Sequence, residues 1–225
     1  DPHIIGGDFS SNVSDYVDPA YVCQEKDGRF VVLPRTAENA VAKIGEAYYE
    51  TLDKAIGVVT EGQTITLLGD LTLASPINVV DKDFVLDLGN ATLSNPSGTV
   101  FNTMDSTIEI KNGTVKTANL LWAPAITVDT GTKLTIAKDA VVSGTYGIGV
   151  NQVLSAEKST AGKDTVIDIY GTVTGVNDDK VLDVGGTPAL SINGNLNSTT
   201  DFATIHLHEG AVLTGYQGRS GNINN

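Results

Sequence analysis

The segment LDLGNATL (Leu86 to Leu93) contains a short apolar-alternating strand, a tight polar turn and a second apolar-alternating strand. The same pattern occurs in ITLLGDLTL (Ile65 to Leu73), IEIKNGTVK (Ile108 to Lys116), LTIAKDAVV (Leu134 to Val142), IDIYGTVTG (Ile167 to Gly175) and IHLHEGAVL (Ile205 to Leu213). Repetition of this kind is typical of stacked structural units, because one such unit cannot bury a hydrophobic core alone. The six copies therefore predict a solenoid of short strands.

The spacing of the copies favours one solenoid in particular. Their first apolar residues are separated by 21, 22, 26, 33 and 38 residues, at Ile65, Leu86, Ile108, Leu134, Ile167 and Ile205. The first two spacings match one coil of a parallel β-helix, and the later coils carry insertions. A third strand is predicted in each coil, at residues 77–79, 99–101, 125–128, 148–150 and 189–192. We therefore expect a mainly β protein, a right-handed parallel β-helix with three short strands per coil and about six coils.

The alternation also predicts which side chains are buried. Successive side chains of a strand point to opposite faces, and neighbouring strands lie roughly 4.8 Å apart. We expect aliphatic columns made of Ile65 and Leu67, Leu86 and Leu88, Ile108 and Ile110, Leu134 and Ile136, Ile167 and Ile169, and Ile205 and Leu207. The alternative architecture is an antiparallel sandwich, which would need hairpin turns at alternate connections.

The start of the chain has a different organisation. Residues 1–36 predict a strand and hairpin segment, with a Lys26-Asp27-Gly28 turn, that ends a preceding module. Residues 37–61 predict a second hairpin and a helix from Leu52 to Val59, capped by Thr51. This small α+β segment would cover the open end of the β-helix, which occupies residues 62–225, because terminal repeats need a cap.

Composition excludes several classes of function. The formal net charge is -13 and the chain has three arginines, Arg29, Arg35 and Arg219, so a nucleic-acid partner is not expected. Cys23 is the single cysteine, so no internal disulfide can form. No apolar run approaches the roughly 18 residues that span a membrane, so membrane insertion is not expected. The chain contains no nucleophile motif, and its histidines are His3, His206 and His208.

Two carboxylates give a candidate binding or catalytic pair. The predicted alignment places Asp87 beside Glu109 at outward positions of neighbouring coils, about 5 Å apart. Such a pair can share Ca²⁺ or act as acid and base on a sugar. Polar residues are also what any exposed strand face carries, and no arginine lies nearby to assist elimination chemistry. We therefore expect no resident cofactor, with Ca²⁺ as the open alternative.

A weaker candidate is a metal site. His206 and His208 stand two residues apart on one predicted strand, and Asp168 occupies the equivalent outward position one coil earlier. His-x-His with a carboxylate suits a metal ion, but no fourth ligand is evident, and a surface histidine pair is the alternative.

An insertion at residues 117–124 gives a candidate protein-binding site. It contains Leu120, Leu121 and Trp122, the last being the single tryptophan. An exposed aromatic side chain with apolar neighbours is a typical anchor for a partner. The alternative is that these three residues fold back and seal the insertion.

Two segments resemble a known type of module. AVAKIGEAYYETLDKAIGVVTEGQTITLLGDLTL (Ala40 to Leu73) and IIGGDFSSNVSDYVDPAY (Ile4 to Tyr21) are similar to modules repeated in large cell-surface, adhesin-like proteins of Gram-positive gut bacteria. The resemblance covers the start of the chain and the cap, and the coils only generically. It implies a parallel β-helix and no catalytic residues. The GG-x-F segment that closes such a module is missing after Gly215.

The resulting functional hypothesis is a secreted or cell-wall-attached, non-catalytic adhesion module. Its surface and loop insertions would bind a host protein such as immunoglobulin, or a glycan or mucin, and neighbouring modules of the parent chain would flank it. One alternative is a polysaccharide-active lyase or glycoside hydrolase that uses Asp87, Glu109 and Asp168. The other is a purely structural stalk.

Overall fold

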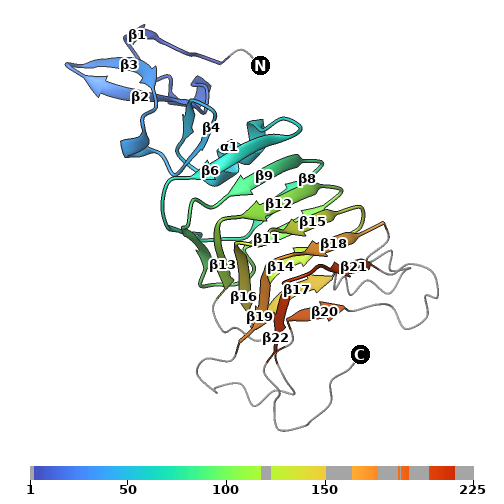
Figure 1. Cartoon of the computed structure of the whole chain (residues 1–225). Coiled ribbons are helices and arrows are strands. Elements are labelled where there is room, and N and C mark those ends of the chain that lie inside the picture. The colour runs from blue at the N-terminus through green and yellow to red at the C-terminus, as the bar shows by residue number, and fades with distance from the viewer. Residues whose placement is uncertain are drawn as a thin grey trace, which may run out of the picture.

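The computed structural model describes residues 3–117, 123–150, 164–176, 187, 189–192 and 203–215. Within these residues the protein is mainly β, with 22 strands, one α-helix and two 3₁₀ helices. The strands form four sheets, and three of these sheets consist mostly of parallel strands (Figure 1). This arrangement is compatible with a parallel β-helix and excludes the alternative of an antiparallel sandwich.

The N-terminal segment forms a small antiparallel sheet, drawn in blue in Figure 1. Its strands, in the spatial order β1-β3-β2, are β1 (Gly7–Phe9), β2 (Tyr21–Lys26) and β3 (Arg29–Pro34). The 3₁₀ helices are η1 (Ser14–Tyr16) and η2 (Ala37–Asn39). Asp27 and Gly28 have φ values of 54° and 75°, the left-handed conformation that a two-residue hairpin turn requires. The predicted hairpin is therefore confirmed.

The largest sheet has eight strands, in the order β21-β18-β15-β12-β9-β6-β4-β5. Its strands are β4 (Ala42–Ile44), β5 (Ala47–Tyr49), β6 (Gln63–Leu67), β9 (Asp83–Asp87), β12 (Thr107–Lys111), β15 (Lys133–Ile136), β18 (Val166–Ile169) and β21 (Thr204–Leu207). All neighbours from β6 to β21 are parallel, whereas β4 is antiparallel to both β5 and β6.

Two further parallel sheets complete the repeating part of the fold. The six-stranded sheet contains β7 (Leu71–Thr72), β10 (Thr92–Asn95), β13 (Gly113–Thr117), β16 (Ala140–Gly144), β19 (Thr172–Gly175) and β22 (Val212–Thr214). The five-stranded sheet contains β8 (Ile77–Val80), β11 (Phe101–Met104), β14 (Pro124–Val128), β17 (Tyr146–Val150) and β20 (Leu190–Ile192). From β6 onward, consecutive strands of the chain belong to different sheets, so each repeat adds one strand to each of the three sheets.

The predicted helix is α1 (Leu52–Val58). The Thr51 side chain accepts a hydrogen bond from the backbone N–H of Lys54 at 3.2 Å and so caps the first turn. The apolar face of the helix is buried, and it joins the same hydrophobic core as the strands. The helix packs against β4 and β5.

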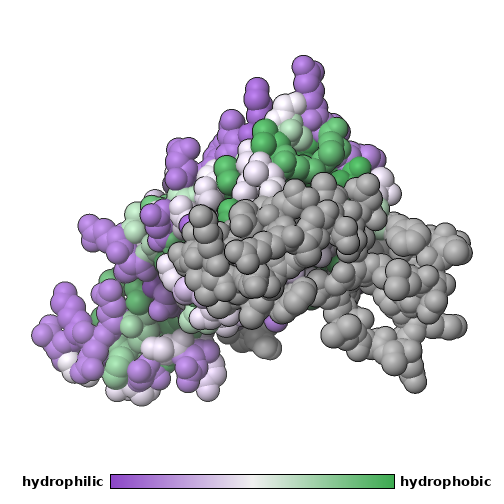
Figure 2. Space-filling model, turned by 90° about the horizontal axis from the view of Figure 1, so that it is seen from below, coloured by the Kyte–Doolittle hydropathy of each residue, from purple (hydrophilic) through white to green (hydrophobic). Residues whose placement is uncertain are grey.

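The inward columns are confirmed over most of their length. The buried members are Ile65, Leu67, Leu86, Leu88, Ile108, Ile110, Leu134, Ile136, Ile167 and Ile169. The last predicted pair differs, because Ile205 is half-buried and Leu207 is 57% exposed. Both lie on β21, the terminal strand of its sheet, where no further described strand covers the inward side chains. Figure 2 views the molecule from below, and hydrophobic surface borders hydrophilic side chains among the described residues at the margin of this view.

One register prediction is wrong. Leu86 pairs with Ile65 as expected, but on its other side it pairs with Ile110 instead of Ile108. The lengths of the turns explain the difference. Leu86 pairs with Ile110, 24 residues later, whereas Leu93 in the next strand of the chain pairs with Val115, only 22 residues later. The turn between β12 and β13 is therefore two residues shorter than the turn between β9 and β10. A slip of two residues keeps every side chain on its own face, so the apolar alternation cannot reveal it.

Arg35 connects the N-terminal hairpin to the α1 region. Its side chain is 7% exposed, and its guanidinium donates hydrogen bonds to the Tyr21 carbonyl at 3.1 Å and the Asn39 carbonyl at 3.3 Å. It also binds the Glu50 carboxylate at 3.2 Å. The hydrogen bond from Lys54 and its charge lower the pKa of Glu50, partial burial opposes this, and Arg35 adds to the lowering. A lowered pKa means that the ion pair stabilises the fold above the ordinary pKa of 4.5 and is lost as the pH falls through the lowered value.

The aliphatic columns give a direct stability prediction. Leu86→Ala should lower the free energy of unfolding by about 2 to 5 kcal/mol, because it leaves a cavity between two covered neighbours. Val80, which is 42% exposed, is the control, and Val80→Ala should cost less than about 1 kcal/mol. Urea unfolding followed by circular dichroism measures both, and equal effects would contradict a core built on these columns.

Arg35 gives a second stability prediction. Arg35→Ala should lower the free energy of unfolding by about 2 kcal/mol, because three acceptors lose the charged donor that this buried side chain supplies. Lys54→Ala removes an exposed i,i+4 partner of the same Glu50 carboxylate and should cost no more than about 0.5 kcal/mol. Thermal unfolding at neutral pH compares the two variants. A Lys54→Ala effect as large as that of Arg35→Ala would show that Arg35 does not hold the two parts together.

Candidate functional site

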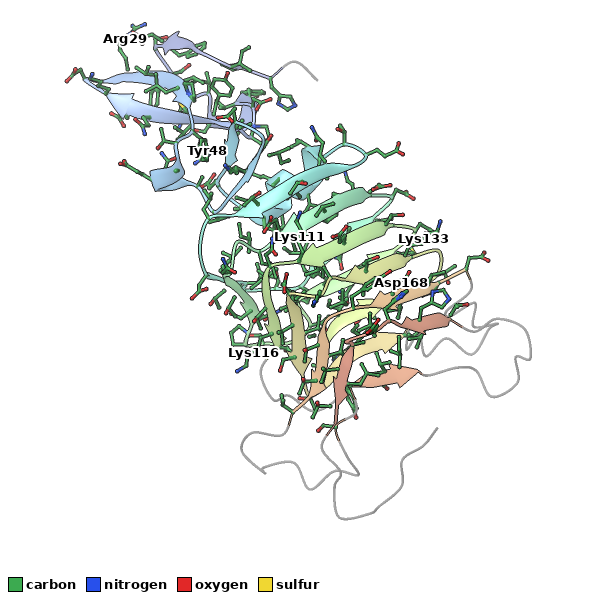
Figure 3. The ribbon with its side chains drawn as sticks, viewed as in Figure 1. Arg29, Tyr48, Lys111, Lys116, Lys133 and Asp168 are labelled. Atoms are coloured by element: carbon green, nitrogen blue, oxygen red, sulfur yellow. The ribbon has the colours of Figure 1, made fainter. Side chains whose placement is uncertain are left out.

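The outward face of the eight-stranded sheet carries four of the predicted site residues, Asp87, Glu109, Asp168 and His206. One row of paired positions runs through Tyr48, Lys43, Thr66, Asp87 and Lys111. The adjacent row runs through Thr64, Val85, Glu109, Thr135, Asp168 and His206. Figure 3 labels Tyr48, Lys111, Lys133 and Asp168 on this sheet, whereas Lys116 belongs to β13 in the six-stranded sheet. The face therefore combines aromatic, cationic and acidic side chains on the strands of one sheet.

Asp87 and Glu109 do not form the paired carboxylates that the sequence predicted. Asp87 lies opposite Lys111, and Glu109 lies opposite Val85, in the other row. The Asp87 carboxylate accepts hydrogen bonds from the Gly89 backbone N–H at 3.0 Å and from the Asn112 side chain at 3.1 Å. The Lys111 ammonium lies 3.8 Å from its second oxygen. The Asp87 carboxylate therefore links the turn at Gly89 to the turn at Asn112 in the next repeat.

Asn112 is a hydrogen-bond partner of Asp87 that the sequence did not predict. Its φ is 56°, a left-handed conformation that asparagine tolerates better than most residues, and it precedes Gly113 in a tight turn. This conformation places its side-chain amide beside Asp87 one repeat earlier. The Asn112-Gly113 dipeptide was the signal in the sequence, but it indicates a turn and does not identify the hydrogen-bond partner.

Glu109 is the less constrained of the two carboxylates. It is half-buried between Val85 and Thr135, and no hydrogen bond or ion pair to its carboxylate is found within the described part of the chain. Its carboxylate is therefore free to contact a ligand of this face.

Asp168, His206 and His208 do come together. Asp168 on β18 pairs directly with His206 on β21, and its Oδ1 lies 2.9 Å from His206 Nδ1 and 2.8 Å from His208 Nε2. An ionised carboxylate only accepts hydrogen bonds, so each imidazole donates the N–H that faces it. The His208 ring stacks on Tyr170, with 3.8 Å between ring centroids and 8° between planes. Three potential metal ligands thus share one small area of the sheet.

The environment of Asp168 favours its ionised form. The hydrogen bond from His208 lowers the pKa of the carboxyl group, partial burial opposes the lowering, and the hydrogen bond and charge of His206 add to it. The carboxylate is therefore negative at neutral pH and attracts cationic groups to this position.

An acidic hollow of about 400 Å³ lies at the corner between β8 and β9. It is lined by Val59, Glu61, Asp81, Lys82, Asp83, Asp105 and Thr107. The Lys82 ammonium donates to the Gly57 carbonyl at 2.9 Å. The hollow adds an acidic concavity to one margin of the eight-stranded sheet.

The remaining predicted anchor falls outside the described residues. Leu120, Leu121 and Trp122 all belong to the stretch 118–122, which the structure does not describe. Their predicted role in binding a partner stays a prediction.

Comparisons with known proteins give no information about the site, which is therefore interpreted from its own geometry. No protein-family model matches the chain, and neither a curated protein nor a solved structure matches it. Among the described residues, none of the helices has the length and apolar character needed to cross a bilayer.

The different surroundings of the two carboxylates give a prediction. Asp87→Ala should lower the free energy of unfolding by about 1 to 3 kcal/mol, because it leaves the Gly89 N–H and the Asn112 amide without their acceptor. Glu109→Ala is the matched control on the neighbouring strand and should change it by no more than about 0.5 kcal/mol. Urea unfolding of both variants measures the difference. If Glu109→Ala proves the more destabilising, the register described here is wrong.

Proposed function

We propose that this chain is a non-catalytic binding module of a bacterial surface protein, located outside the cell. In this proposal the three parallel sheets form a right-handed parallel β-helix, and α1 closes its N-terminal end. The module binds through the outward face of the eight-stranded sheet, and the partner is a host protein such as immunoglobulin, or a glycan or mucin. Residues 1–36 belong to the end of a preceding module.

The observation that carries the proposal is the composition of this face. Strands of this one sheet present Tyr48 and Lys43 on β5 and β4, and Glu109, Lys111 and Lys133 on β12 and β15. The hydrogen bonds between paired strands fix the backbone of this surface. Tyrosine is enriched at the energetically dominant positions of interfaces, and charged residues around it give specificity. A rigid surface also loses little conformational entropy when it binds.

The surroundings of Asp87 favour binding over sugar cleavage. A catalytic acid and base must both reach the same bond and exchange protons with the substrate. Asp87 is instead bound to the Gly89 N–H and to Asn112, and its partner across the strands is Lys111. The similarity of residues 4–21 and 40–73 to adhesin-like surface modules supports the same conclusion.

A binding panel tests the proposal. The whole chain is passed over immobilised immunoglobulin, mucin and a glycan array, and binding to at least one of these is expected by surface plasmon resonance. The triple variant Tyr48→Ala, Glu109→Ala and Lys111→Ala should lower the affinity for that ligand at least about tenfold, because it removes the aromatic anchor and both kinds of charge.

Lys116→Ala is the matched control. Lys116 is an exposed lysine on β13, in a different sheet, and its removal should leave the affinity within about twofold. Thermal unfolding checks that each variant remains folded. Binding of the wild-type chain to none of the three ligand classes would refute the binding role, and so would turnover of a polysaccharide. An equal loss in Lys116→Ala would refute the assignment to this face.

A further inference from the structure

The fold gathers three metal-ligating side chains on two adjacent strands. Asp168 and His206 are direct partners across the parallel pair β18 and β21, and His208 follows two residues after His206. Residues i and i+2 of an extended chain project to the same side, so both imidazoles face the Asp168 carboxylate. Asp168 precedes His206 by 38 residues in the sequence, so the sheet, and not sequence proximity, creates the cluster.

The distances within the cluster suit a small divalent ion. The two imidazole nitrogens lie 2.9 and 2.8 Å from one carboxylate oxygen, and the ligand atoms of the three residues all lie within 4.8 Å of one another. A tetrahedral ion with bonds of about 2.0 to 2.1 Å holds its ligand atoms about 3.3 Å apart. Side-chain rotations that move each nitrogen a few tenths of an ångström away from the carboxylate oxygen, and bring the two imidazole nitrogens to a similar separation, complete this geometry. The proton on each coordinating nitrogen then moves to the other nitrogen of the same ring.

We propose that Asp168, His206 and His208 form a binding site for Zn²⁺. The ligand set decides the ion, because neutral imidazole together with one carboxylate suits zinc and its neighbours among the transition metals. Calcium prefers six to eight oxygen ligands, and this cluster supplies two imidazoles and a single carboxylate. The site is separate from the binding role proposed above and does not depend on it.

The cluster is held in place before any ion binds. The His208 ring stacks face to face on Tyr170, which lies in the turn after β18, and it meets the His206 ring edge-on at 6.2 Å. The backbones of all three ligands are fixed by paired parallel strands or by the turn that follows them. A preorganised set of ligands loses less entropy on binding than flexible surface side chains do.

The site remains accessible from solvent. The side chains of His206, His208 and Asp168 are 52%, 33% and 30% exposed. Three protein ligands leave the fourth position of a tetrahedral ion to water or to an atom of a bound molecule. The site therefore has the open character of exchangeable zinc rather than that of a closed structural centre.

Isothermal titration with Zn²⁺ tests the proposal on the whole chain, prepared without affinity-tag histidines and in a buffer that does not chelate metals. One ion per chain is expected. Asp168→Asn and His208→Ala should each weaken binding at least about tenfold, because even the loss of an outer-shell partner typically costs 10- to 100-fold in metal affinity. Ca²⁺ at the same concentration should not displace Zn²⁺.

Two controls exclude other sources of zinc binding. His3→Ala removes the remaining histidine and Cys23→Ser removes the single thiol, and both variants should retain the wild-type affinity. Zn²⁺ should also raise the melting temperature of the wild-type chain more than that of Asp168→Asn, whereas the two proteins should melt alike in a chelator.

The absence of Zn²⁺ binding by the wild-type chain would overturn the proposal. An undiminished affinity in Asp168→Asn would overturn it as well, because the His-x-His pair would then bind zinc without the carboxylate.

Discussion

The structure depends on the packing of aliphatic side chains into columns across parallel strands. Each inward side chain contacts its counterparts in the strands on either side, so a single repeat gains its buried surface from its neighbours. Parallel pairing fixes this contact, because the repeating strands of each sheet run in the same direction and present the same face. The outward side chains consequently occupy regular positions on the sheet surfaces, and the functional character of the protein is determined by what those positions carry.

The turns decide which outward positions are neighbours. Asn90 and Asn112 both adopt left-handed backbone conformations, and the Asn90 N–H donates to the Asn112 carbonyl at 2.6 Å, so the two turns lie against each other. The turn at Asn112 is two residues shorter than the one before it, and the strand that precedes it pairs two residues out of the expected alignment. Asp87 therefore contacts Lys111 and Asn112, and its carboxylate serves the stability of the fold.

The eight-stranded sheet unites the two proposed roles of the protein. The strands from β5 to β15 carry the mixed aromatic and charged face, and β18 and β21, towards the other edge of the sheet, carry the histidine and aspartate cluster. Ions or ligands bound at either region would contact side chains held by the same hydrogen-bonded scaffold. Since the strands are rigid, binding at such a surface relies on side-chain placement and involves little rearrangement of the backbone.

The sequence by itself determined the repeating strands, the hairpins, the helix from Leu52 and the faces on which side chains lie, because alternation and turn residues are local signals. It also placed Asp168 and His206 at equivalent positions, since β18 and β21 align without a slip. Only the tertiary structure decided that Asp87 and Glu109 are separated. A shift of the strand pairing by two residues leaves the alternation of apolar and polar side chains unchanged, and turn length sets that shift. The tertiary structure alone also decided that Leu207 is exposed and that the His208 ring stacks on Tyr170. Both features depend on which residues pack next to the ends of β18 and β21.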